Sequence, residues 1–122
     1  MIIRILTMLL ALVAAVPSTA LAQKAIKVGM PMPLSGPPAL FGDPASKGAQ
    51  MFVEEINAKG GLLGRQIKII YSDTKSDIAY GATAAQDVID KGASMVVVTC
   101  DYDFGSAAAS VADSANLIAF ST

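Results

Sequence analysis

Two patterns of hydrophobic and polar positions alternate along the chain, and each predicts one type of element. Short apolar runs typical of strands fall at residues 26–30, 67–71, 95–98 and 117–120, and the longer segments between them favour helices. Met95–Val98 contains no polar residue, which is typical of a strand buried on both faces of a parallel sheet. The order β-α-β-α-β-α-β therefore predicts an α/β protein with an open parallel sheet.

The helix between the first two strands is expected to begin at Asp43 and Pro44. Asp43 can cap free backbone N–H groups, and proline suits the first helical position. The spacing of apolar residues predicts one buried face, formed by Ala49, Phe52, Val53 and Ile56. Gly60 and Gly61 are expected to end this helix because glycine enters the left-handed conformation without steric cost.

Two further helices are expected. Asp77 should cap the first of them and Gly92 should end it. Its predicted buried face consists of Ile78, Ala82, Ala85 and Ile89. The second is rich in small residues and is expected from about Ser106 to Ser114, which leaves residues 101–105 as a loop.

The carboxyl ends of the predicted strands are the expected ligand site, because ligands of open α/β sheets bind there. The segments at these ends are 33–43, 100–106 and 121–122. Tyr102 and Phe104 suit the wall of a pocket for a small ligand, or they pack beneath their loop. Asp101 and Asp103 are either solvated loop acids or polar contacts to a ligand.

The composition disfavours catalysis and metal binding. Histidine is absent, which removes the commonest general base and metal ligand. No dinucleotide fingerprint follows the first strand and no Gly-x-Ser-x-Gly is present. The glycine-rich segment 60–65 is interpreted as a helix end followed by a turn. Asp101 and Asp103 are not followed by the glycine and glutamate that a calcium loop needs at its later positions. We expect no enzyme activity, no cofactor and no metal.

The first 22 residues are typical of a secretory signal peptide. Arg4 precedes an apolar run at 5–16 that is too short to span a membrane, and Ala20-Leu21-Ala22 is a small-x-small cleavage site. We expect cleavage after Ala22 and a periplasmic location. Residues 23–122 hold eight basic and ten acidic residues, a balance that gives nucleic acid no electrostatic attraction. Cys100 is the only cysteine, so it has no intrachain partner, and we expect a buried thiol.

Many short motifs occur in a specific order along residues 25–122. They are Ile26-Lys27-Val28-Gly29, Pro33-Leu34-Ser35-Gly36-Pro37, Phe41-Gly42, Gly48-Ala49-Gln50, residues 55–61, Leu63-Gly64-Arg65 and Ser72-Asp73-Thr74. This series resembles the start of the branched-chain amino-acid (Leu/Ile/Val) type of periplasmic solute-binding protein of ABC transporters. The resemblance implies a type I periplasmic binding protein fold, whose two lobes close on a small solute and deliver it to a membrane permease. Residues 23–122 would form the N-terminal part of lobe one.

The resemblance also implies candidate ligand-binding residues. Segment 101–105 matches a loop that contacts the carboxylate or amide end of the ligand, and Tyr102 stands where amino-acid binders carry a serine. The aromatic ring indicates an amide, urea-like or aromatic solute beside amino acids. Ser35 and Phe41 match a loop at the cleft mouth, and Ser121 matches the end of the fourth strand. The candidates are Ser35, Phe41, Asp101, Tyr102, Asp103, Phe104 and Ser121.

Family chains are far longer, so the resemblance implies a truncated lobe one. The leading expectation is the solute-binding component of an ABC importer for amino acids or related small polar solutes. Alternatives are a ligand-sensing domain of a regulator or receptor on the same fold, or a non-functional remnant. An α/β enzyme is the weakest alternative because its motifs are missing.

Overall fold

Four parallel strands form one sheet in the computed structural model, which describes residues 24–122. The elements are β1 (Ile26–Met32), α2 (Ala39–Ala58), β2 (Ile67–Asp73), α3 (Ile78–Asp90), β3 (Met95–Val98), α4 (Tyr102–Ser114) and β4 (Ala119–Ser121). The spatial order is β2-β1-β3-β4, and every neighbouring pair is parallel. The α/β class and the parallel open sheet are confirmed, whereas the predicted signal peptide lies outside the described residues.

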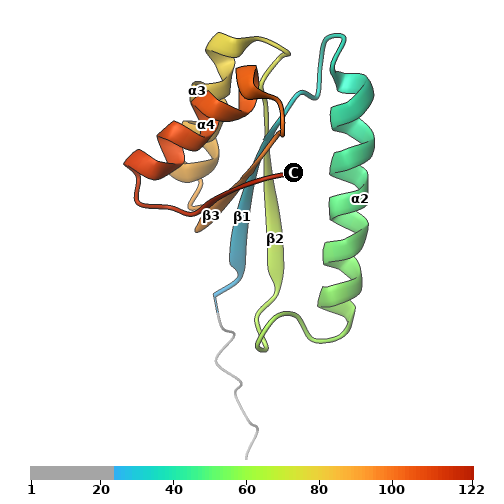
Figure 1. Cartoon of the computed structure of the whole chain (residues 1–122). Coiled ribbons are helices and arrows are strands. Elements are labelled where there is room, and N and C mark those ends of the chain that lie inside the picture. The colour runs from blue at the N-terminus through green and yellow to red at the C-terminus, as the bar shows by residue number, and fades with distance from the viewer. Residues whose placement is uncertain (1–23) are drawn as a thin grey trace, which may run out of the picture.

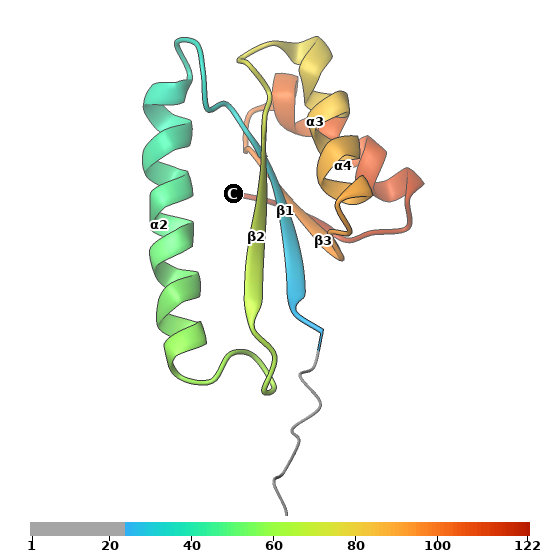
Figure 2. The same ribbon diagram turned by 180° about the vertical axis from the view of Figure 1, so that it is seen from behind.

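Helices cover both faces of the sheet. Helix α2 lies on one face, and α3 and α4 lie together on the other (Figures 1 and 2). The main core fills the space between β3 and the α3–α4 pair, and its buried members are Ala85, Val88, Ala93, Val96, Val98, Ala108 and Ala112. On the opposite face α2 packs against β2, where the Tyr71 hydroxyl donates a hydrogen bond of 2.8 Å to the Ser46 carbonyl.

Glycines let α3 approach its neighbours closely. A Cβ atom on Gly29 of β1 would lie 2.5 Å from Cγ2 of Val88. A Cβ atom on Gly81 of α3 would lie 2.9 Å from the carbonyl oxygen of Phe104 in α4. Both distances are shorter than a van der Waals contact, so a larger residue at either place would push α3 outward.

The predicted start of the first helix is wrong. Helix α2 begins at Ala39, and Pro44 lies inside it. Two other prolines start the helix: Pro37 and Pro38 accept hydrogen bonds from the N–H groups of Leu40 and Phe41. Proline has the φ angle of a first helical turn, so proline does start this helix, but at Pro37 and Pro38 and not at Pro44. Asp43 instead forms an ion pair of 2.6 Å with Lys47.

The predicted buried faces of two helices are partly wrong. In α2 Val53 is buried as expected, but Phe52 is 64% exposed. In α3 Ala85 is buried as expected, but Ile78 is 55% exposed. The buried residues of α3 are Gly81, Ala84, Ala85 and Val88. Close packing on β1 and α4 selects the face with small residues, a choice that apolar spacing alone does not reveal.

The region predicted as a loop after β3 is the first turn of α4. This helix begins at Tyr102 because the Asp101 side chain caps it, accepting a hydrogen bond of 2.7 Å from the Phe104 N–H. The other predicted helix ends hold: Asp77 caps α3, and Gly60, Gly61 and Gly92 follow their helices with positive φ. β1 and β2 extend two residues beyond the prediction, whereas β4 covers Ala119–Ser121 rather than 117–120.

Candidate functional site

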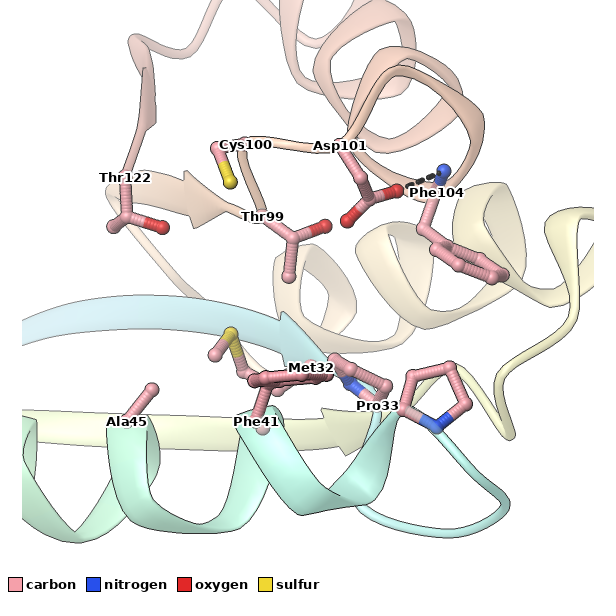
Figure 3. Close-up of a pocket in the computed structure, with 11 residues that line it drawn as sticks. Met32, Pro33, Phe41, Ala45, Thr99, Cys100, Asp101, Phe104 and Thr122 are labelled. Carbon is pink, nitrogen blue, oxygen red and sulfur yellow. Dashed lines mark hydrogen bonds between the residues drawn. The ribbon is translucent and has the colours of Figure 1, made fainter.

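A pocket of about 480 Å³ lies at the carboxyl edge of the sheet. Figure 3 shows that it has two walls, one from β1 and α2 and one from the segment after β3 with the start of α4. We name it the edge pocket, and its lining residues are Met32, Pro33, Pro38, Phe41, Gly42, Ala45, Thr99, Cys100, Asp101, Phe104 and Thr122. The three segments nominated from the sequence therefore meet at one place.

Each wall of the edge pocket depends on a glycine. A Cβ atom on Gly42 in α2 would lie 2.1 Å from the Pro33 carbonyl oxygen. A Cβ atom on Gly105 in α4 would lie 2.1 Å from the Thr99 carbonyl oxygen. Only glycine permits these close approaches, so both helix starts sit directly on the strand ends that precede them.

Asp73 at the end of β2 fixes the loop that leads into α2. Its carboxylate accepts hydrogen bonds from the Ser35 hydroxyl at 2.6 Å, the Ser35 N–H at 3.2 Å and the Leu34 N–H at 2.9 Å. The Lys75 N–H donates a fourth bond of 2.8 Å. Partial burial raises the pKa of Asp73, but the Ser35 hydroxyl and these backbone N–H groups outweigh it, so the pKa lies below its usual value.

The predicted site residues fall into three groups. Phe41, Asp101 and Phe104 line the edge pocket. Tyr102 and Ser121 line a second hollow of about 210 Å³, which shares Thr99, Cys100 and Asp101 with the first. Neither hollow has Ser35 or Asp103 among its lining residues. A role in binding stays a prediction for all seven.

The structure gives Ser35 and Tyr102 surroundings that the sequence did not reveal. The Ser35 hydroxyl donates to Asp73, and the Ser35 carbonyl accepts a hydrogen bond of 2.5 Å from the Ser76 hydroxyl. Ser35 thus ties two loops together. Tyr102 is 84% exposed at the first position of α4, so the loop in which we expected its ring is absent.

Four residues at the site were not predicted from the sequence. Met32, Ala45 and Thr99 line the edge pocket, and Asp73 holds Ser35 in the loop that leads into α2. Met32 was missed because β1 is two residues longer than predicted. Thr99 directly follows the buried run of β3, so its position at a strand end was a usable signal.

Cys100 lies at the surface and not in the core. Its thiol is exposed at the carboxyl end of β3, where it borders the edge pocket. The expectation of a buried thiol is therefore wrong. The expectation came from the usual state of a lone cysteine and not from its position, since the chain leaves the sheet after Val98 and carries Cys100 beyond the strand end.

The edge pocket combines apolar surface with a few polar atoms. Met32, Phe41 and Phe104 supply apolar side chains, and Thr99 and Asp101 supply oxygen atoms. Such a mixture is typical of sites for small organic molecules. Within residues 24–122 no three His, Cys, Asp or Glu side chains lie close enough together to hold a metal ion. No helix in that range is both long and apolar enough to cross a membrane.

The parallel sheet with helices on both faces is the fold of part of a type I periplasmic binding protein. The model of the family described as periplasmic binding protein matches residues 25–122, and this chain belongs to that family. The resemblance found in the sequence is thereby confirmed.

Several known proteins are similar to the chain. It is 38% identical over 91 residues to the Leu/Ile/Val-binding protein BraC3 of Rhizobium johnstonii, covering 75% of this chain and 25% of that protein. The branched-chain amino acid transporter substrate-binding protein LivJ of Streptococcus pneumoniae, solved in complex with isoleucine, superposes with a TM-score of 0.75 at 35% identity. That match covers 80% of this chain and 28% of LivJ. The chain thus spans about a quarter of the length of these relatives.

Other relatives show how widely the fold is used. A fatty acid ABC transporter substrate-binding protein of Thermomonospora curvata superposes with a TM-score of 0.72 at 22% identity, covering 81% of this chain and 25% of that protein. At this identity the match shows the shared fold alone. The fold therefore does not identify the ligand, which has to be argued from the residues of the edge pocket.

Proposed function

We propose that this protein is the solute-binding component of an ABC importer for amino acids or related small polar solutes. The observation that carries the proposal is the edge pocket, which lies at the ligand-binding edge of an open α/β sheet. Membership in the periplasmic binding protein family and similarity to Leu/Ile/Val-binding proteins support a transport role over a catalytic one. Amide, urea-like and aromatic compounds belong to the same proposal.

Calorimetric titration of the chain with amino acids and simple amides tests this proposal. A solute that binds the folded chain at a hundredfold excess over Kd should also raise its free energy of unfolding by about 2.7 kcal/mol. The unfolding temperature should rise accordingly. Phe41→Ala should weaken binding because its ring lines the edge pocket. Phe52→Ala is the matched control, since Phe52 lies on the same helix, is also exposed and is not among the lining residues. Equal effects of the two variants would contradict a site at the edge pocket.

We further propose export to the periplasm by residues 1–22. The basic Arg4, the apolar run at 5–16 and the small-x-small sequence before Gln23 support this. Sequencing the N-terminus of the protein recovered from the periplasm should give Gln23 as the first residue. An intact Met1 in a cytoplasmic fraction would contradict export.

The proposed partner is the membrane permease of an ABC transporter. The importer-subunit relatives support this assignment. Sequencing the DNA that flanks the coding region tests it, and a permease or ATPase gene beside it is the expected result. A regulator gene in that place would favour the ligand-sensing alternative.

A further inference from the structure

Asp101 is the one charged side chain among the described residues that line the edge pocket. One of its carboxylate oxygens caps α4 by accepting the Phe104 N–H at 2.7 Å. The other accepts no hydrogen bond from residues 24–122, and Figure 3 shows it turned toward the space between the two walls. The pocket therefore contains a hydrogen-bond acceptor with a full negative charge and spare capacity.

A ligand carboxylate finds no favourable place on this wall. The start of a helix attracts anions through its free N–H groups and its dipole, but two acids already occupy the start of α4. Asp101 caps it, and Asp103 lies in its first turn. Within residues 24–122 no lysine or arginine lines the pocket to offset their charge. A second negative group placed beside Asp101 would be repelled by its charge.

An N–H donor fits the same place. An amide or ammonium group can donate to the free oxygen of Asp101, and the nearby Thr99 hydroxyl offers a further polar contact. The apolar side chains of Met32, Phe41 and Phe104 surround the remaining space (Figure 3). A branched or straight apolar body attached to the donor would fill it.

We infer that the edge pocket selects solutes that present an amide or ammonium N–H group to Asp101 and rejects solutes that place a carboxylate there. This inference rests on the proposed solute-binding function and names the class of solute. Asp101 is then the specificity-determining residue of this wall, and its capping bond to Phe104 holds the carboxylate in position.

Three probes that share one apolar body and differ only in their terminal group test how the charge of that group affects binding. They are 4-methylpentanamide, 4-methylpentylamine and 4-methylpentanoate, titrated by calorimetry into the full chain at neutral pH. We expect the amide and the amine to bind at least about tenfold more tightly than the carboxylate. Asp101→Asn removes the charge and keeps a capping oxygen. It should therefore weaken binding of the amine by about tenfold and strengthen binding of the carboxylate.

Asp77→Asn is the matched control. Asp77 caps α3 as Asp101 caps α4, accepting the Ala79 N–H at 2.8 Å, but it lies outside the lining of the edge pocket. Both variants change the stability of one helix start in the same way. Only Asp101→Asn should change the order of affinities among the three probes.

Each outcome decides the inference. Preference for the amide and amine that Asp101→Asn removes and Asp77→Asn retains would support it. Carboxylate binding as tight as amide binding, or equal effects of the two variants, would overturn it and leave the solute-binding function standing. Amino-acid binding without binding of the amide or the amine would do the same. If neither these probes nor any amino acid bound the folded chain, both proposals would fail.

Discussion

Single side chains with several hydrogen bonds hold the loops around the edge pocket. Asp73 is the most connected of them, since four donors from the β1–α2 and β2–α3 loops converge on its carboxylate. A charged acceptor makes stronger bonds than a neutral one, so the ionised form of Asp73 is favoured in the folded state. The lowered pKa of this carboxyl group expresses the same preference.

Asp73→Asn should therefore lower the free energy of unfolding by about 1 kcal/mol near neutral pH. The folded pKa lies below the ordinary value of 3.8, so the stabilisation is present above that value and is lost as the pH falls through the folded pKa. Urea unfolding at several pH values measures the difference between variant and wild type. It should shrink as the pH falls from 3.8 through the folded pKa, and it should be absent at more acidic pH. Asp113→Asn is the control, since Asp113 is an exposed residue near the end of α4. A difference that stays constant with pH, or an equal difference for the control, would contradict this account.

At the scale of elements, the fit between helix starts and strand ends shapes the pocket. Helix α2 rests on the Pro33 carbonyl through Gly42, and α4 rests on the Thr99 carbonyl through Gly105. Only three residues separate β3 from α4, and six separate β1 from α2. The walls of the edge pocket thus combine helix starts with the short segments that follow the strands, and the close contacts at the two glycines hold these parts together.

Two glycines of the same helix should respond to alanine in opposite directions. Gly42→Ala places a methyl group 2.1 Å from the Pro33 carbonyl oxygen and should cost about 1–3 kcal/mol of stability. Gly48→Ala meets nothing within 4 Å and should stabilise α2 by about 0.5–1 kcal/mol, because alanine is the better helix former. Thermal unfolding of the two variants measures both effects. Stabilisation by Gly42→Ala would show that α2 does not rest on Pro33.

At the scale of the whole molecule, large apolar side chains remain exposed on α2 and on the edge strand β4. Helix α2 packs against β2, whereas β4 forms the opposite edge of the sheet. Phe120 in β4 is 53% exposed and Phe52 in α2 is 64% exposed. Exposed apolar groups and an unpaired strand edge both favour association.

The chain should consequently self-associate as its concentration rises. Phe52→Lys combined with Phe120→Lys should reduce this association, since each change replaces an exposed ring with a charge. Sedimentation velocity over a range of concentrations measures it. A wild-type chain that stays monomeric throughout would show that these side chains do not form a contact surface.

The amount that could be predicted differed between elements. Asp77 and the glycines at 60, 61 and 92 gave correct helix ends because capping and positive φ are properties of a few adjacent residues. The start of α2 was wrong because two proline-containing segments both fit a helix start, and local rules do not rank them. For the candidate site, the strand ends were predictable, but the role of Ser35 was not, since its partner Asp73 lies 38 positions away.

The sequence by itself determined the order of strands and helices, the parallel sheet and the edge at which a pocket forms. These follow from apolar periodicity, which reflects the burial of each element, and from the rule that parallel strands end at a common edge. Only the tertiary structure decided which helix faces are buried and which residues line the edge pocket. Those choices depend on how closely backbones approach across the sheet, at positions such as Gly29 and Gly42, and on hydrogen bonds between residues distant in the chain.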